Sequence, residues 1–170
     1  MHKELKLTGS GGQGLILAGV ILADAALMDG KNAVQSQSYG PEARGGASKA
    51  EVIIATGEID FIKVQNTDML LCLTQTAYDR YAKDAAALLI VDADIELKYH
   101  KPEEVVQIPI IYTAQVTLKR PMVANIVALG AVNARMNLVS KESLKKSVLT
   151  RVPKGTEELN EKALELGYSL

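Results

Sequence analysis

The chain has 170 residues, of which 48% are apolar and 23% charged, and its formal net charge at pH 7 is −1. This length suffices for one ordinary domain with a proper core, so we expect a single domain over residues 1–170. The nearly neutral charge, with lysines and arginines dispersed along the chain, lacks the basic footprint of a nucleic-acid-binding protein. It also gives no reason to expect contact with an anionic membrane surface.

Cysteine and histidine are too scarce to predict a metal centre. Cys72 is the only cysteine, so no internal disulfide can form and a reducing, cytoplasmic location is expected. One thiolate cannot supply the four ligands that an iron–sulfur cluster usually takes. Neither His2 nor His100 has a second ligand at metal-binding spacing. The amino terminus lacks the apolar core of a signal peptide, and the most apolar run contains Asp24 and is shorter than a membrane span.

The amino-terminal part of the chain predicts strands around one helix. Residues 5–9 form a strand, and residues 14–28 form an almost uniformly apolar helix that ends before Gly30. Such a helix is covered on more than one side, either by its own sheet and neighbours or by another subunit. Two further strands are expected at 32–39 and 47–55, separated by a polar, glycine-rich loop.

The rest of the chain continues this alternation and then becomes helical. Buried strands are expected at 68–74 and 87–94, a weaker strand at 103–111, and helices at 75–86, 121–137, 141–148 and 156–167. Pro109 favours an edge position for the weaker strand, Ser140 and Thr156 are predicted helix caps, and Gly167 is predicted to end the last helix. The fold class is therefore α/β. We expect a three-layer α/β/α, Rossmann-like domain with a helical carboxyl-terminal third; its sheet is mainly parallel, with a mixed sheet as the alternative.

The motif GSGGQG, residues 9–14, joins the first strand to the first helix. Gly9, Gly11 and Gly14 fit G-x-G-x-x-G, which lets backbone N–H groups approach an anion at the positive end of a helix. Dinucleotide binding also requires an acidic residue about 20 positions further on, but the second strand offers only residues 35–38, QSQS. The missing acid argues against NAD or FAD. A Walker loop is excluded because no lysine followed by Ser or Thr comes after the glycines, and close helix–strand packing remains the alternative use of the motif.

A second loop, SYGPEARGG, covers residues 38–46. It places Tyr39, Glu42 and Arg44 among three glycines and a proline, a composition that is costly to order. One interpretation is an exposed turn with a weak Glu42–Arg44 ion pair. The other is a ligand crevice shared with the first loop, because both loops follow the carboxyl ends of strands. Gln13 of the first loop can donate to a phosphate or a carbonyl, or bond a neighbouring loop.

These motifs resemble the gamma subunit, or gamma domain, of the 2-oxoacid:ferredoxin oxidoreductases, which act on pyruvate, 2-oxoglutarate and branched 2-oxoacids. The resemblance begins with GSGGQG, the apolar helix after it, and SYGPEARGG. It continues in order through LTQTAYDRY, LLIVDAD, MVANIVALGAV and NEKALELGY, and so covers essentially the whole chain.

The resemblance implies that the chain is one subunit of an enzyme complex that oxidatively decarboxylates a 2-oxoacid to acyl-CoA and passes electrons to ferredoxin. It implies alpha and beta partner subunits, with a ferredoxin-like delta subunit left open. Thiamine diphosphate, Mg and [4Fe-4S] clusters are expected in those partners, and CoA is the co-substrate. The chain has neither the Gly-Asp-Gly motif nor the later Asn-Asn pair of thiamine sites. We therefore expect no catalytic residue in this chain alone and no activity of the isolated chain.

Two alternatives stay open beside this interpretation. The chain can be a stand-alone nucleotide- or CoA-binding module of Rossmann-like fold, or a purely structural scaffold. Whether the isolated chain forms a homodimer through its apolar surfaces is also left open.

The resemblance assigns the two loops to the CoA region of a composite site. The residues so assigned are Gly9, Gly11, Gly12, Gln13, Gly14, Tyr39, Glu42, Arg44, Gly45 and Gly46. Arg44 is the expected anion partner, since a guanidinium can grip phosphate or carboxylate with two hydrogen bonds; an interface salt bridge is its alternative. Cys72, Tyr78 and Tyr81 are interpreted as packing residues, and Asp92 and Asp94 as turn caps.

Overall fold

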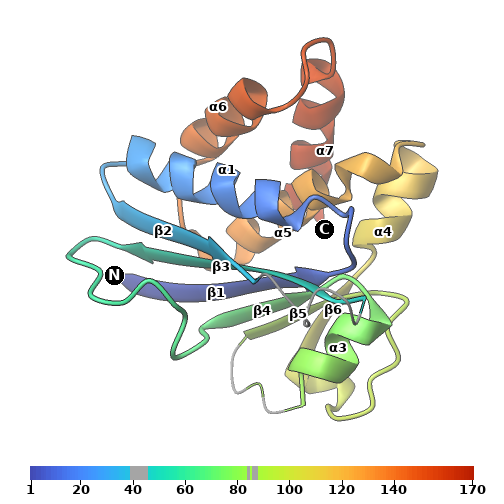
Figure 1. Cartoon of the computed structure of the whole chain (residues 1–170). Coiled ribbons are helices and arrows are strands. Elements are labelled where there is room, and N and C mark those ends of the chain that lie inside the picture. The colour runs from blue at the N-terminus through green and yellow to red at the C-terminus, as the bar shows by residue number, and fades with distance from the viewer. Residues whose placement is uncertain (39–45, 84, 86–87) are drawn as a thin grey trace.

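Six strands form one mixed sheet in the computed structural model, which describes residues 1–38, 46–83, 85 and 88–170 (Figure 1). The strands are β1 (His2–Gly9), β2 (Asn32–Gln37), β3 (Ser48–Ala55), β4 (Met69–Cys72), β5 (Leu88–Asp92) and β6 (Val105–Ile108). They lie in the order β2-β3-β1-β4-β5-β6. β3 is antiparallel to β1 and β2, whereas β1, β4, β5 and β6 are parallel to one another. This confirms the predicted sheet, with β6 and its neighbour Pro109 at the edge.

Helices cover both faces of the sheet, but unequally. They are α1 (Leu15–Met28), α3 (Gln75–Tyr81), α4 (Ile110–Tyr112), α5 (Ala124–Met136), α6 (Lys141–Arg151) and α7 (Glu157–Ser169), with the short turns η1 (Pro102–Glu104), η2 (Thr113–Thr117, π-helical) and η3 (Pro121–Val123). Figure 1 shows α1, α5, α6 and α7 on one face and α3 on the other. Two separate apolar clusters match these two faces, so the predicted three-layer α/β architecture is confirmed. None of the described helices is long and apolar enough to cross a membrane.

The apolar helix α1 is covered by its own chain. One side packs on β2 and β3, where Gly19 lies against the side chains of Gln35 and Val52. The other side meets α6, whose Ser147 hydroxyl donates to the Ile21 carbonyl over 2.9 Å. Sheet and helices of the same chain therefore account for most of its uniform hydrophobicity.

The predicted end of the last helix at Gly167 is wrong, because α7 continues to Ser169. Gly167 instead lies where α7 crosses α5. A Cβ atom built on Gly167 would overlap the Val127 carbonyl oxygen and lie 3.0 Å from the Gly130 Cα atom. A Cβ atom on Gly130 would likewise overlap the Leu164 carbonyl oxygen. The two glycines thus permit a backbone-to-backbone contact that no side chain fits.

Two other predicted helices, and the start of the last one, also need adjustment. The segment predicted at 121–137 opens as the short turn η3 before α5 begins, and it ends at Asn137, whose φ is 47°. Thr156 precedes α7, but its side chain does not cap the helix; the hydroxyl donates to the Pro153 carbonyl over 2.6 Å. The helix predicted at 75–86 ends earlier, at Tyr81, and residues 82 and 83 form a turn.

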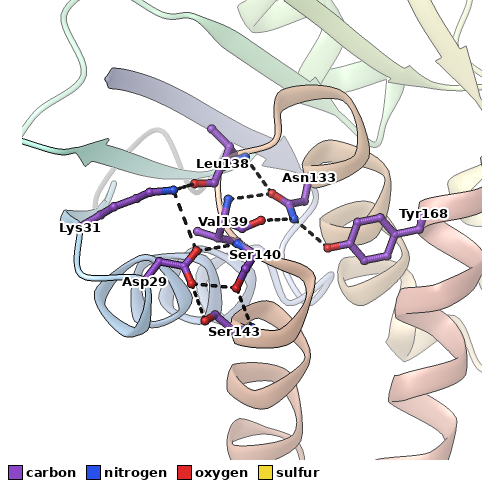
Figure 2. Close-up of polar contacts among 8 residues, drawn as sticks. All are labelled: Asp29, Lys31, Asn133, Leu138, Val139, Ser140, Ser143 and Tyr168. Carbon is purple, nitrogen blue, oxygen red and sulfur yellow. Dashed lines mark hydrogen bonds and ion pairs between the residues drawn. The ribbon is translucent and has the colours of Figure 1, made fainter.

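Asp29, just past the end of α1, fixes the start of α6 (Figure 2). Its carboxylate accepts hydrogen bonds from the Ser140 backbone N–H (2.6 Å), the Ser140 hydroxyl (2.8 Å) and the Ser143 hydroxyl (2.6 Å). The Ser140 hydroxyl also accepts from the Ser143 N–H, which confirms Ser140 as the helix cap. Burial raises the pKa of Asp29, but the hydrogen bonds from Ser143 and Ser140 and the nearby Lys31 charge outweigh it, so the pKa lies below its ordinary value.

Asn133 of α5 fixes the same connection from inside (Figure 2). Its side-chain oxygen accepts from the backbone N–H groups of Leu138 and Val139, and its amide donates to the Val139 carbonyl and the Tyr168 hydroxyl. The side chain is only 3% exposed. One amide therefore satisfies three backbone groups of the loop between α5 and α6.

Replacing Gly167 by alanine is expected to destabilise the protein by about 2–3 kcal/mol, because the added methyl group forces α5 and α7 apart. Urea unfolding at pH 7 measures the change. Gly57→Ala is the matched control, since the space around Gly57 is open. Equal stability of the two variants would contradict the described helix crossing.

Replacing Asp29 by asparagine is expected to cost about 1–2 kcal/mol at pH 7, because the charged cap of α6 is lost. The pKa of Asp29 is lower in the folded state, so its contribution is present above the unfolded pKa and is lost as the pH falls through the folded pKa. Urea unfolding of wild type and variant should therefore converge in acid. Asp60→Asn, at an exposed position, is the control and should match wild type at each pH.

Candidate functional site

The glycine turn after β1 is shaped by two left-handed residues. Gly12 has a φ of 85° and Gly14, immediately before α1, has a φ of 72°, conformations that L side chains rarely adopt. Gly9 is crowded for another reason: a Cβ atom there would overlap the Gln13 amide oxygen. Around Gly11 and Gly12, by contrast, no atom lies within 4 Å of an added Cβ. Close packing therefore explains Gly9 and Gly14 but not the open space above Gly11 and Gly12.

Gln13 closes the turn rather than reaching outward. Its side-chain oxygen accepts a hydrogen bond of 2.7 Å from the Ser10 backbone N–H. The bond lies within the loop of Gln13 itself, rather than to a ligand or to a neighbouring loop as expected. The side chain holds the strand-to-helix turn in one conformation.

The first turn of α1 presents uncapped backbone donors. Gly14 has no side chain to cap the helix, and no acidic residue lies in the first turn. Within the described part of the chain, no hydrogen-bond acceptor is found for the N–H groups of Gly11 and Gly12. The first N–H groups of a helix lack intrahelical partners and carry partial positive charge. The arrangement can bind an anionic group without any charged side chain of its own.

Asn125, in the first turn of α5, supports the glycine turn from behind and was missed by the sequence analysis. Its side-chain amide donates to the Gly14 carbonyl over 3.1 Å, and a Cβ atom on Gly14 would lie 2.6 Å from the same nitrogen. Asn125 is 4% exposed. A polar residue within the apolar run of residues 123–132 was the one available signal for it.

The two loops start from the same edge of the sheet (Figure 1). Gly9 at the end of β1 pairs with Ser48 at the start of β3, and the Ser38 N–H donates to the Lys49 carbonyl. Gly46 is exposed, with a φ of 78°. Residues 39–45 lie outside the described part of the chain, so the assignments of Tyr39, Glu42, Arg44 and Gly45 stay predictions. The described ends of this loop agree with the expected common edge.

Cys72 is a buried thiol of low reactivity. Its side chain has no exposed surface, and the Thr8 hydroxyl donates to its sulfur over 3.4 Å. Burial raises the pKa of Cys72 to about 12. These facts agree with its interpretation as a packing residue.

The other polar candidates have structural partners. Asp92, 2% exposed at the end of β5, accepts from the backbone N–H groups of Asp94 and Ile111, so it caps turns as expected. Burial raises the pKa of Asp92 despite these hydrogen bonds. Tyr78 is buried; its hydroxyl accepts from the Tyr99 N–H and contacts the His100 ring at 3.0 Å. Over the described ranges, no group of three His, Cys, Asp or Glu residues is placed to hold a metal ion.

The chain is similar to known proteins over its full length. Residues 4–170 match the family described as pyruvate ferredoxin/flavodoxin oxidoreductase. The 2-oxoglutarate synthase subunit KorC of Methanocaldococcus jannaschii is 53% identical, with 100% of this chain and 94% of the relative covered. The crystal structure of the keto/oxoacid ferredoxin oxidoreductase gamma subunit from Geobacter sulfurreducens is 49% identical, with a TM-score of 0.89 over 99% of this chain and 95% of that one.

A more distant structure shares the fold. It is the 2-oxoglutarate:ferredoxin oxidoreductase from Magnetococcus marinus with 2-oxoglutarate, coenzyme A and succinyl-CoA bound. Its identity to this chain is 21% and its TM-score is 0.84, over 99% of this chain and 30% of that one.

The chain belongs to the pyruvate ferredoxin/flavodoxin oxidoreductase family. Within that family it is a gamma subunit of the 2-oxoacid:ferredoxin oxidoreductase type. The resemblance drawn from GSGGQG and SYGPEARGG is thereby confirmed.

Cys72 is expected to resist thiol reagents in the folded protein. At neutral pH a thiol with a pKa of about 12 has roughly a thousandfold less thiolate than an ordinary cysteine, and burial blocks access as well. Titration with a chromogenic disulfide reagent should show no rapid reaction in buffer and one equivalent of thiol in denaturant. Complete labelling of the native chain within minutes would contradict the described burial.

Proposed function

We propose that this gamma subunit completes the CoA-binding region of a composite active site in a 2-oxoacid:ferredoxin oxidoreductase. The observation that carries the proposal is the glycine turn after β1, which has open space above Gly11 and Gly12 and uncapped N–H groups in the first turn of α1. Phosphate groups are suited to such a site because the helix terminus supplies several converging donors. The phosphate-bearing candidate is CoA, which the Magnetococcus marinus enzyme of similar fold holds.

The 2-oxoacid of the complex is proposed to be 2-oxoglutarate. The support is the name of the full-length relative that is 53% identical, a 2-oxoglutarate synthase subunit. The related Magnetococcus marinus enzyme, similar to this chain in fold, holds 2-oxoglutarate, coenzyme A and succinyl-CoA.

The two loops are proposed to have different roles at this site. Gly9, Gln13 and Gly14 keep the turn in shape, while Gly11 and Gly12 leave room for the ligand. The second loop is proposed to supply the side chains of Tyr39, Glu42 and Arg44, together with Gly45 and Gly46. Arg44 is proposed to grip a phosphate or carboxylate of CoA with two hydrogen bonds.

The redox chemistry is proposed to lie in the partner subunits. The residues of this chain do not fit an iron–sulfur cluster or a thiamine site, since its one cysteine is buried with a raised pKa and no thiamine motif occurs in the sequence. Thiamine diphosphate with Mg and the [4Fe-4S] clusters, held by alpha and beta subunits and by a ferredoxin-like delta subunit where one exists, supply decarboxylation and electron transfer to ferredoxin. The complex is proposed to be cytoplasmic.

Replacing Arg44 by alanine in the reconstituted complex is expected to raise the KM for CoA by about tenfold or more, because a charge-assisted, bidentate contact is lost. The KM for 2-oxoglutarate should stay within about twofold. Steady-state reduction of ferredoxin or a dye measures both. Arg151→Ala, at the end of α6, is the control. An unchanged KM for CoA in the Arg44 variant would favour a scaffold role for the second loop.

Calorimetry on the isolated full chain separates the composite site from a stand-alone module. Weak or undetectable binding of CoA, NAD and FAD is expected, because the remaining walls of the site belong to other subunits. Tight binding of any one of them to the isolated chain would favour the module. Reduction of a dye by the isolated chain with 2-oxoglutarate would overturn the proposal that the redox chemistry lies in the partner subunits.

A further inference from the structure

A polar cavity lies on the α3 face of the sheet, away from the glycine turn. It is about 480 Å³ in volume, and its polar lining comes from Lys6 of β1, the segment Gln65–Thr67 and Tyr81 of α3. Residues 65–67 lead into the amino end of β4, whereas the glycine turn follows the carboxyl end of β1. The cavity is therefore separate from the proposed CoA region.

Lys6 brings an unbalanced positive charge to this cavity. The side chain is half-buried, and among the described residues no carboxylate lies within 4 Å of its ammonium group. Glu51, directly opposite Lys6 in the β1–β3 register, is occupied: it contacts Lys49 at 2.9 Å and accepts from the Val64 N–H at 3.3 Å. Lys6 therefore offers a positive charge that no described carboxylate neutralises, and an anion in the cavity would pair with it.

Glu4, the other buried acid on this face, is occupied as well. One carboxylate oxygen accepts from the backbone N–H groups of Gln65 and Asn66, at 2.5 and 2.8 Å. Burial raises the pKa of Glu4, but these hydrogen bonds and the contact with His2 outweigh it and hold the pKa below its ordinary value. The charge of Glu4 thus anchors the segment that forms the cavity wall, and it is not free to pair with Lys6.

Tyr81, which lines the same cavity, has an unused hydrogen-bond donor. Its hydroxyl oxygen is buried and has no hydrogen-bond partner in the described part of the chain. Two cations lie over its ring: Lys49 Nζ is 5.9 Å and Arg80 Cζ 5.6 Å from the ring centroid. Buried hydroxyl groups rarely lack a partner, so an orphan hydroxyl on a residue that lines the same cavity as an unpaired lysine points to a missing acceptor.

We propose that this cavity binds a carboxylate or phosphate anion, with Lys6 as its counter-charge and Tyr81 as a hydrogen-bond donor. The side chains of Gln65, Asn66 and Thr67, which make no hydrogen bonds to the described residues, supply further donors at the wall. The anion comes either from a free small molecule or from an acidic side chain of a partner subunit. Both sources present the same chemistry to Lys6.

The first experiment titrates the ¹⁵N-labelled full chain with inorganic phosphate and, separately, with glutarate, at constant ionic strength. Saturable amide shifts are expected at residues 65–67 and at Tyr81. Lys6→Met should weaken binding by about tenfold or more, since a charged partner is removed. Lys162→Met, at an exposed position of α7, should bind as wild type does.

Tyr81→Phe tests the hydroxyl by itself. Because that hydroxyl has no partner in the ligand-free chain, its removal should leave the melting temperature unchanged or slightly raised. Anion affinity should fall by about three- to tenfold, the usual effect of one hydrogen bond. A lower melting temperature with unchanged affinity would assign Tyr81 a structural role and remove it from the site.

The second experiment identifies the source of the anion by asking whether Lys6→Glu still assembles with the alpha and beta subunits. Saturable binding of a probe with normal assembly of the variant indicates a free anion. Failed assembly of Lys6→Glu, with no probe binding to the unmodified chain, indicates an acidic side chain of a partner. Lys6→Met should then assemble poorly too, although its melting temperature shows that it is folded, so misfolding is not the cause. Absence of both effects, or an unchanged affinity of Lys6→Met for the anions, would overturn the proposal.

Discussion

The hydrogen bond from the Asn125 amide to the Gly14 carbonyl connects the glycine turn to the rest of the molecule. Gly14 adopts a left-handed conformation, and its carbonyl also accepts the first intrahelical bond of α1, from Ala18. The direction in which α1 leaves the sheet therefore depends on where α5 places Asn125. Any shift of α5 would move the N–H groups that the first turn of α1 presents.

The position of α5 is in turn set by α7. At Gly130 and Gly167 the two helices touch through their backbones, which leaves no freedom for either helix to slide or rotate by the width of a methyl group. Asn133, one turn further along α5, binds both the connection to α6 and the Tyr168 hydroxyl of α7. The helical carboxyl-terminal third thus acts as a rigid support for a site formed at the other end of the chain.

The sequence predicted the parts of this arrangement that depend on local chemistry. Alternation and apolar runs identified the strands, Gly30 and Ser140 marked real helix boundaries, and the glycine pattern located the turn before α1. Gly167 was misinterpreted because a glycine near a helix end is usually a terminator, and only the partner glycine 37 positions away explains it. Contacts between distant residues leave no local signal.

The same limit applies to the polar groups. Asn125 lies 111 positions from Gly14, and Lys6 lies 75 positions from Tyr81, so neither pairing can be seen in any window of sequence. The connection between β2 and β3 covers residues 38–47, which is shorter than a parallel crossover requires, so the antiparallel direction of β3 was open to prediction from the sequence. Of the candidate site, the sequence could predict the two loops but not the residues that support them.

The buried titratable groups of the chain hold its structure in place. Its one thiol is buried with a pKa raised to about 12, and the buried acids Glu4 and Asp92 are occupied in holding backbone N–H groups. At the glycine turn the chain presents backbone N–H groups, which do not titrate and do not transfer electrons. Such groups can hold a phosphate in a fixed place, so the glycine turn is suited to binding, and a reaction beside it needs reacting groups from elsewhere.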